Sequence, residues 1–201
     1  MSYSSELTKE RILDCAKIEF LSKGFAKANM REIARGAKVT TGAMYNHFKN
    51  KEMLFEALVG KVANELYILF KNEQKKNDVI KDFLSEETEK VYEKSTFAIL
   101  DFIYAHLDQM TLLFCHSTGT KYEKFKNKLI KIEEQSILEM LKSYNISLKK
   151  SDLFFVHVIA SSGVNNMIEA VSHDLPQEQA ILYMEKLHAF YYAGWKKILE
   201  Q

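Results

Sequence analysis

A short polar segment near the N-terminus carries the side chains best suited to bind a nucleic acid. Residues 41–48 have the pattern of a short helix that exposes hydroxyl, amide and imidazole groups, which can hydrogen bond to base edges or to phosphates. These exposed side chains are Thr41, Tyr45, Asn46 and His47. Gly42 falls within the first turn, where a glycine costs about 1 kcal/mol relative to alanine. We therefore expect a partner to approach the backbone at Gly42 closely.

The apolar residues around this segment predict a helix-turn-helix. A preceding short helix has an apolar face formed by Met30, Ile33, Ala34 and Ala37. Val39 is the apolar residue of the turn that follows. Two short helices joined by a turn of three or four residues form the arrangement that lets the second helix enter the major groove of DNA.

Each helix of this segment is preceded by a residue that can cap it. Asn29 can accept a hydrogen bond from the first turn of the first helix, and Glu32 is placed to complete a capping box. Thr40 and Asn50 precede the next two helices. Lys51 lies at the positive end of the third helix, which is a natural phosphate site.

The stretch GFAKANMREIARGAKVTTGAMYNHFKNKEML, residues 24–54, resembles the DNA-binding segment of the TetR (tetracycline-repressor-like) family of bacterial transcription regulators. The resemblance rests on many residues at fixed spacing, which are Gly24, Phe25, Ile33, Ala34, Val39, Gly42, Tyr45, Phe48, Lys51, Glu52 and Leu54. Two positions depart from the pattern. Asn29 replaces the usual threonine cap, and Lys38 replaces the usual glycine of the turn, so that this turn must accept a side chain.

The resemblance implies a set of DNA contacts around the second helix. Thr41 and the backbone beside Gly42 and Ala43 are expected to reach base edges, whereas Tyr45 and His47 are expected to hold phosphates. The complete set of expected DNA-binding residues is Asn29, Arg31, Thr40, Thr41, Gly42, Ala43, Tyr45, Asn46, His47 and Lys51.

Composition and charge predict an all-α protein of two parts. The chain has 201 residues, of which 47% are hydrophobic, with one proline and seven glycines, so it is too apolar to be disordered and too poor in turn residues to be all-β. Residues 1–51 hold ten Lys/Arg and five Asp/Glu, a net charge of +5, and the remainder hold eighteen and twenty-two, a net charge of −4. We expect a three-helix DNA-binding head, residues 1–52, joined by a long helix to a helical bundle, residues 53–201, that binds ligand and dimerises.

The helix boundaries follow from caps and apolar spacing. Thr8 is expected to cap the first helix and Gly24 to end it, with Phe25 folding back onto the core. The later helices are expected over residues 51–75, 85–105, a short segment ending at 119, 121–143, a segment capped by Ser147 or Ser151 and ending near 172, and a last helix with Pro176 in its first turn. The polar stretch 72–78 is the expected boundary between the two parts.

The last two helices are apolar around most of their circumference, so each must be buried on most sides. They form either the centre of the bundle or a four-helix interface between two chains. The resemblance to the TetR family favours a homodimer interface made by Val164, Met167, Val171, Met184, His188, Tyr191 and Trp195.

The second part of the chain is rich in aromatic side chains with a few polar groups among them, which is the composition of a small-molecule site. The alternative is a solid core. The resemblance favours a pocket for an unknown small-molecule effector, lined by Phe97, Phe102, Tyr104, Phe114, His116, Phe154, His157 and Asn165.

Several other functions find little support in the sequence. There is no HExxH motif, no glycine-rich phosphate loop and no Cys/His metal pattern, so we expect no enzyme activity, no metal and no cofactor. Cys15 and Cys115 are far apart, and Cys15 is expected to be a buried free thiol. The chain lacks an apolar signal core and any apolar stretch near the ~20 residues that cross a bilayer, so we expect a cytoplasmic protein with no membrane partner.

The sequence thus predicts a homodimeric repressor that binds a palindromic operator in double-stranded DNA and leaves it when a small molecule binds the second part. Two alternatives remain open. One is a DNA-binding architectural protein without an effector, and the other is an all-α enzyme in which a histidine approaches Cys115.

Overall fold

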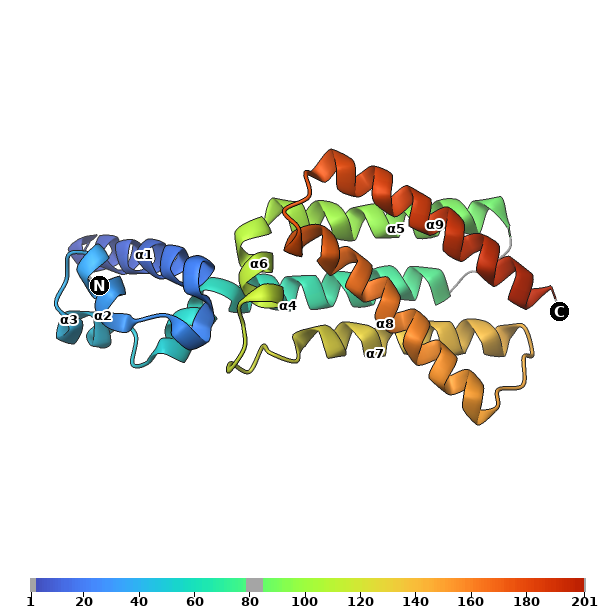
Figure 1. Ribbon diagram of the computed structural model, residues 1–201, viewed down its shortest axis with the longest axis horizontal. Helices are drawn as coiled ribbons and strands as arrows, with labels where there is room; N and C mark the ends of the chain where they lie inside the picture. Colours follow the sequence, from blue (N-terminus) through green and yellow to red (C-terminus); the bar gives the residue numbers. More distant parts are fainter. Residues whose placement is uncertain (1–2, 79–84, 201) are drawn as a thin grey trace. The chain divides into compact units, whose positions relative to one another are not determined.

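The computed structural model describes residues 3–78 and 85–200, and most of these residues are helical (Figure 1). No strand occurs within these two ranges, which confirms the predicted all-α class. The helices are α1 (Tyr3–Lys27), α2 (Met30–Gly36), α3 (Thr41–His47), α4 (Lys51–Asp78), α5 (Glu86–Ala105), α6 (Leu107–Cys115), α7 (Phe125–Ser143), α8 (Lys150–Ser172) and α9 (Gln177–Leu199).

The chain forms two compact units, and each is described by itself. Within the described residues, unit 1 comprises 3–65 and 106–125, and unit 2 comprises 66–78, 85–105 and 126–200. Helix α4 therefore contributes its first half to unit 1 and its second half to unit 2. The predicted limit of the DNA-binding domain at residue 52 falls inside unit 1, and it stays a prediction about function rather than about compactness.

Unit 1 is built on a core shared by α1, α2, α3 and α4. Ile12, Ala16 and Phe20 of α1 are fully buried, as their helical spacing predicts. The ring of Phe20 lies edge-on to that of Phe55 of α4, with 5.2 Å between the centroids. Met44 of α3 belongs to the same buried core, so α1 supports the shorter helices through this core.

Gly24 interrupts α1 and turns the chain back into this core. Its φ of 70° lies in the left-handed region, which glycine adopts without the steric cost of a side chain. Phe25 then packs against Phe20 and Phe55, and its N–H donates to the carbonyl of His116 at 3.0 Å. The predicted break at Gly24 and the inward turn of Phe25 are confirmed.

Two predicted features of the first four helices are wrong. Helix α1 already begins at Tyr3, so Thr8 lies inside it rather than at its cap. Helix α4 continues to Asp78, so the polar stretch 72–78 is a helical turn and not a linker. The division between the compact units falls instead between Glu65 and Leu66. Glu73 within this stretch is buried, so the polar composition of residues 72–78 indicates neither a linker nor uniform exposure to solvent.

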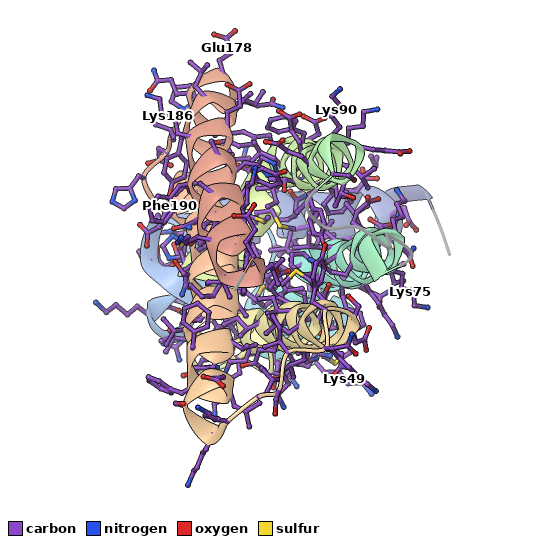
Figure 2. The ribbon with its side chains drawn as sticks, turned by 90° about the vertical axis from the view of Figure 1, so that its right-hand side faces the viewer. Lys49, Lys75, Lys90, Glu178, Lys186 and Phe190 are labelled. Carbon is purple, nitrogen blue, oxygen red and sulfur yellow. The ribbon has the colours of Figure 1, made fainter. Side chains whose placement is uncertain are left out.

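Unit 2 is a bundle in which the second half of α4 lies beside α5 and α7, and α8 and α9 cover one side of these three helices (Figures 1 and 2). A buried cluster of Leu100, Ala170, Ala180 and Met184 joins α5, α8 and α9. The Tyr104 hydroxyl donates to the carbonyl of Leu175 at 2.5 Å. This bond fixes the connection between α8 and α9 against α5.

Several boundaries in the second half of the chain differ from the predicted ones. Helix α6 ends at Cys115 and α7 begins at Phe125, because residues 116–124 form turns in which the Thr120 side chain bonds the Ser117 carbonyl. Helix α8 is preceded by Lys149, whose N–H donates to Asp152 Oδ2 at 2.7 Å, so neither predicted serine caps it. Pro176 is the N-cap of α9, one residue before its first turn.

No single helix in the described ranges is long and apolar enough to span a membrane. One bent pair, α5 with α6, passes the same test by length and composition, and the two helices are broken at His106.

Candidate nucleic-acid interface and cavity

The turn between α2 and α3 determines how α3 is presented. Val39 donates its N–H to the carbonyl of Ala34 at 3.0 Å, and Lys38 donates to that of Arg35 at 3.1 Å. Lys38 has a φ of 56°, in the left-handed region, at the position where the family pattern has glycine. The turn therefore keeps its left-handed geometry and accepts the strain of a side chain, which costs about 1–2 kcal/mol.

The predicted caps of the short helices are confirmed. Asn29 Oδ1 accepts from the N–H of Arg31 at 2.9 Å, and Thr40 Oγ1 accepts from the N–H of Ala43 at 3.1 Å. Asn50 Oδ1 accepts from the third residue of α4 at 2.8 Å. Each cap satisfies a backbone donor that has no partner within its own helix.

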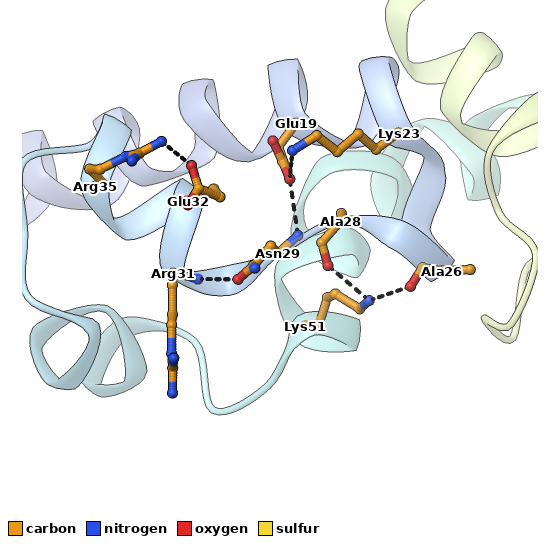
Figure 3. Close-up of polar contacts among 9 residues, drawn as sticks. All are labelled: Glu19, Lys23, Ala26, Ala28, Asn29, Arg31, Glu32, Arg35 and Lys51. Carbon is orange, nitrogen blue, oxygen red and sulfur yellow. Dashed lines mark hydrogen bonds and ion pairs between the residues drawn. The ribbon is translucent and has the colours of Figure 1, made fainter.

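The predicted capping box at α2 does not form, because another carboxylate takes the bond (Figure 3). The N–H of Asn29 donates to Glu19 Oε1 of α1 at 3.0 Å, and Lys23 Nζ lies 2.9 Å from the same oxygen. Glu32 pairs instead with Arg35. Partial burial raises the pKa of Glu19, but the bonds from Lys23 and Asn29 outweigh burial and hold the pKa below its usual value.

The polar face of α3 is open. Gly42, Tyr45 and Asn46 are exposed, and Thr41 and His47 are partly exposed. A Cβ added at Gly42 would have no neighbour within 4 Å, so no packing among the described residues accounts for this glycine. Met44 and Phe48 point inward and are buried. The helix is thus held by one apolar face and presents the other.

The remaining predicted DNA contacts lie beside this face, but Lys51 has a second role. Its Nζ donates to the carbonyls of Ala26 and Ala28, both at 3.2 Å, and lies 4.6 Å from the ring centre of Phe25 (Figure 3). Lys51 thereby ties the start of α4 to the end of α1. Two of its three N–H donors are engaged, which leaves one for a phosphate.

The eight residues predicted to line a ligand pocket do not come together. Phe114 and His116 lie in unit 1, where Phe114 packs against Phe125. Phe154 and His157 are exposed on α8, and His157 pairs with Glu134. Elsewhere in unit 2, Phe97 and Tyr104 pack on the α5–α8–α9 cluster, Phe102 is partly buried on α5 and Asn165 bonds Ser161.

Unit 2 instead contains a cavity lined by other residues. Its volume is about 150 Å³, roughly ten times what one buried water needs. None of the eight predicted residues lines it. The lining residues on α4, α5 and α7 are Phe70, Glu73, Gln74, Glu89, Tyr92, Ser95, Thr96, Ile99, Glu133, Ser136, Ile137 and Met140. Those on α8 and α9 are Ile159, Gly163, Val164, Asn166, Met167, Met184, Leu187, His188, Tyr191, Tyr192 and Trp195.

Carboxylates are the polar groups that the sequence interpretation missed. Glu133 lines the cavity, accepts a hydrogen bond from Gln74, and has a pKa raised to about 7 by burial. Glu73 is buried and is bonded by Lys76 Nζ at 2.6 Å and by Ser95 Oγ at 2.9 Å. The spacing of Glu133 in the sequence could have indicated that it faces the interior. Glu133 stands four residues from both Leu129 and Ile137, within an apolar stripe.

The seven residues predicted for the dimer interface face the interior of unit 2. Val164, Val171, Met184 and Trp195 are buried, and six of the seven line the cavity, Val171 being the exception. The Tyr191 hydroxyl bonds Ser162 Oγ at 2.7 Å and accepts from Asn166 at 3.0 Å. These side chains therefore join α8 to α9 within one chain.

The same two helices expose a different apolar face. Phe154, Phe155 and Val158 of α8 and Leu182 and Phe190 of α9 are exposed, Phe154 by 70% and Phe190 by 72%. Figure 2 shows Phe190 pointing away from the bundle. Large apolar side chains that remain exposed along adjoining helices mark a surface that another molecule covers.

Neither cysteine forms a disulfide in the structure. Cys115 is exposed, and Cys15 is half-buried rather than buried as predicted. In the parts of the chain that are described, no three His, Cys, Asp or Glu side chains come close enough to hold a metal ion.

The fold and the α2–turn–α3 geometry define the class of helix-turn-helix proteins whose second unit is a helical bundle. Residues 12–58 match the family model described as "Bacterial regulatory proteins, tetR family". The chain is 30% identical over 135 residues to the uncharacterized HTH-type transcriptional regulator YhgD of Bacillus subtilis (strain 168), a match that covers 67% of this chain and 65% of the relative.

Another relative, the uncharacterized HTH-type transcriptional regulator YerO of the same organism, is 30% identical over 124 residues. That match covers 62% of this chain and 41% of YerO. The match to the HTH-type transcriptional regulator UidR of Escherichia coli (strain K12) covers 30% of UidR, so the chain spans less than half of the length of these two relatives.

Solved structures share the fold over almost the whole chain. A transcriptional regulator (TerR/AcrR family) from Aquifex aeolicus VF5 is 19% identical with a TM-score of 0.59, and the match covers 95% of this chain and 99% of that one. A putative TetR-family regulator from Syntrophomonas wolfei is 16% identical with a TM-score of 0.61, covering 92% and 95%. The chain belongs to the TetR family of bacterial regulatory proteins.

The left-handed turn generates a first prediction. Lys38→Gly should raise the free energy of unfolding by up to about 1 kcal/mol, because glycine removes the steric cost at a positive φ. Lys38→Ala is the control, since it removes the charge and keeps the Cβ. Urea denaturation at one fixed protein concentration measures both variants. Equal stability of the two variants would contradict strain at this position.

The bond between Glu19 and Asn29 generates a second prediction. Glu19→Gln should lower the free energy of unfolding at pH 7 by about 1–2 kcal/mol, because a charge-assisted bond is lost. Since folding lowers the pKa of Glu19, its carboxylate stabilises the protein above an unfolded pKa of roughly 4.3 and stops doing so as the pH falls through the folded pKa.

The deficit of Glu19→Gln relative to wild type should therefore shrink below about pH 4. Glu10→Gln, on an exposed position of the same helix, serves as the control and should change little. A deficit that stays constant from pH 7 to pH 3 in urea denaturation would refute the ionised bond.

Proposed function

We propose that this chain is a DNA-binding transcription regulator that acts as a repressor and leaves its operator when a small molecule binds unit 2. The observation that carries the proposal is the exposed face of α3. It offers hydroxyl, amide and imidazole groups without a carboxylate that would repel phosphates. A tight turn and two caps hold it rigidly on the core of unit 1. Similarity to TetR-family regulators supports the same function.

In this proposal α3 enters the major groove and α2 supports it. Thr41 and the backbone at Gly42 contact base edges, where the open space beside Gly42 lets the DNA approach. Tyr45, His47 and the free guanidinium end of Arg31 contact phosphates. Figure 3 shows the Arg31 side chain extending away from Asn29. The remaining contacts are proposed for Asn29, Thr40, Ala43, Asn46 and Lys51.

The proposed DNA-binding form is a homodimer, because two heads with two-fold symmetry match the two half-sites of a palindromic operator. The surface that supports dimerisation is the exposed apolar face of α8 and α9, centred on Phe154 and Phe190. The seven residues predicted from sequence are already used inside one chain. A second copy of the same face would cover these side chains by forming a four-helix contact.

The proposed effector site is the cavity of unit 2, and the chain itself provides the coupling. The backbone passes between the units at residues 65/66, 105/106 and 125/126. Within unit 1, Asp108 at the start of α6 pairs with Lys17 of α1 at 2.9 Å, and Tyr122 donates to Glu56 of α4 at 2.7 Å. A ligand that moves α5 or α7 therefore displaces segments that are bonded to α1 and α4 within unit 1. The coupling free energy between ligand binding and DNA binding is then about 1–3 kcal/mol.

DNA binding generates a third prediction. Tyr45→Phe should weaken binding by about two- to tenfold for all sequences, because one phosphate hydrogen bond is lost. Arg31→Ala should also reduce the slope of log affinity against log salt by about 1, which is the effect of losing one phosphate contact. Fluorescence anisotropy with DNA selected from a random pool measures both quantities.

Matched control variants distinguish the loss of a DNA contact from a general effect on folding. Tyr67→Phe alters a partly buried tyrosine of α4 in unit 2, and Arg35→Ala removes a guanidinium that is paired with Glu32. Neither control should change DNA affinity as much as its partner variant. An Arg31→Ala protein with the wild-type salt slope would rule out its phosphate contact.

Dimerisation generates a fourth prediction. Phe190→Glu should convert the dimer to a monomer that stays folded, because a carboxylate at an exposed position is costly only when a partner buries it. Light scattering after gel filtration gives the mass, and circular dichroism checks folding. Ile68→Glu, at another exposed apolar position of unit 2, is the control and should leave the dimer intact. A Phe190→Glu protein of dimer mass would refute this interface.

A further inference from the structure

We propose that the cavity of unit 2 binds a small organic cation, an amine or amidine with an apolar or aromatic body, whose charged group lies at Glu133. The inference rests on the proposed role of this cavity as the effector site, and it adds the chemical class of the ligand. Three observations carry it: the balance of charged side chains in the lining, the orphaned nitrogen of His188 and the aromatic walls.

The lining is acidic and lacks a basic counterpart. Glu73, Glu89 and Glu133 line the cavity, whereas no lysine or arginine is found among the described lining residues. Lys76, outside the lining, neutralises Glu73. Within the residues that the structure describes, no basic side chain is paired with Glu89 or Glu133. A bound anion would meet uncompensated carboxylates at short range, while a bound cation would offset them.

Glu133 is the best placed of these groups to receive a cation. It accepts one hydrogen bond, from Gln74, and its remaining acceptor capacity is free for a donor from the ligand. Glu133 is partly buried, so the charge attraction to a cation there is screened less by water than at the surface. His188 also lines the cavity, and its Nε2 is buried and has no hydrogen-bond partner among the described residues. It can exchange a second hydrogen bond with the ligand's polar head.

The rest of the lining suits an apolar body. Trp195 and Tyr191 present aromatic rings, and such faces attract cations as well as apolar groups. Met140, Met167 and Met184 are flexible and adapt to ligands of irregular shape. A cavity with apolar walls and a few convergent polar groups binds its ligand by shape and orients it by charge.

The titratable side chains of the lining come from four helices. Glu73 lies on α4, Glu89 and Tyr92 on α5, Glu133 on α7, and His188, Tyr191 and Tyr192 on α9, while the lining residues of α8 do not titrate. Burial raises the pKa of Glu133 to about 7. An amine should therefore bind more tightly as the pH rises from 6 to 8, by up to about tenfold, because the ionised fraction of Glu133 rises.

The test uses three probes of similar length that carry the same phenyl ring and differ in their terminal polar group: 4-phenylbutylamine, 4-phenylbutanol and 4-phenylbutanoate. Trp195 is the only tryptophan of the chain and lines the cavity, so its fluorescence reports binding at this site. At pH 8 the full chain should bind the ammonium at least about tenfold more tightly than the carboxylate, with the alcohol between them.

Variants of the carboxylates test which side chain causes the preference for the ammonium probe. Glu133→Gln should reduce the advantage of the ammonium over the alcohol by about tenfold and abolish its pH dependence. Glu139→Gln, an exposed carboxylate on the same helix, should keep both properties. Glu89→Gln provides a second cavity variant and should reduce the advantage in part. Circular dichroism checks that each variant is folded.

The proposal is overturned if the wild-type chain does not bind the ammonium, if it binds the alcohol or the carboxylate as tightly, or if Glu133→Gln keeps the full preference. These titrations contain no DNA, so they do not depend on how the ligand affects DNA binding. A separate titration of the ammonium into the protein–DNA complex tests release. Selective binding without release would refute the proposed repressor mechanism and leave the ligand class intact.

Discussion

The presentation of α3 depends on satisfying the backbone groups of two very short helices. Helices α2 and α3 have seven residues each, too few to be stable alone in water. Asn29 and Thr40 cap them, and Glu19 of α1 binds the N–H of Asn29, so the first turn of α2 is fixed to the longest helix of the head. Met44 and Phe48 bury the inner face of α3. Its outer face is then free to carry residues that contribute nothing to stability, which is the condition for a surface that reads DNA.

The division of the chain into two units shows what the proposed ligand response would have to connect. The cavity lies wholly within unit 2, and the proposed DNA contacts lie wholly within unit 1. The chain itself connects the two units through the continuous helix α4 and through the backbone at the other two crossings. Residues 106–125 belong to unit 1 although they lie in the middle of the sequence, and Tyr122 and Phe25 anchor them there. These contacts join residues 106–125 to α1 and α4 at several points within unit 1.

The head could be predicted from sequence because its determinants are local. Caps at Asn29, Thr40 and Asn50 act within four residues, and Gly24 acts through its own backbone. The cavity and the proposed dimer interface could not be predicted in this way, because they depend on which of two apolar faces turns inward. Val164 and Phe155 both lie on apolar stripes of α8, yet only Val164 is buried. Hydrophobic periodicity identifies the apolar stripes of a helix, but it does not show which stripe is buried. The presence of aromatic residues did not predict the lining of the cavity either. Glu133, a carboxylate within an apolar stripe, could have indicated where the cavity lies.

The central claim is that two copies of α3 read DNA in successive major grooves. Repeated selection of bound duplexes from a random pool, at low salt and with the purified full chain, tests it most directly. The account predicts enrichment of a two-fold symmetric motif whose half-sites are centred about one helical turn apart, or a multiple of it, roughly 10 base pairs. Enrichment of an asymmetric single site, or no enrichment in any round, would contradict it.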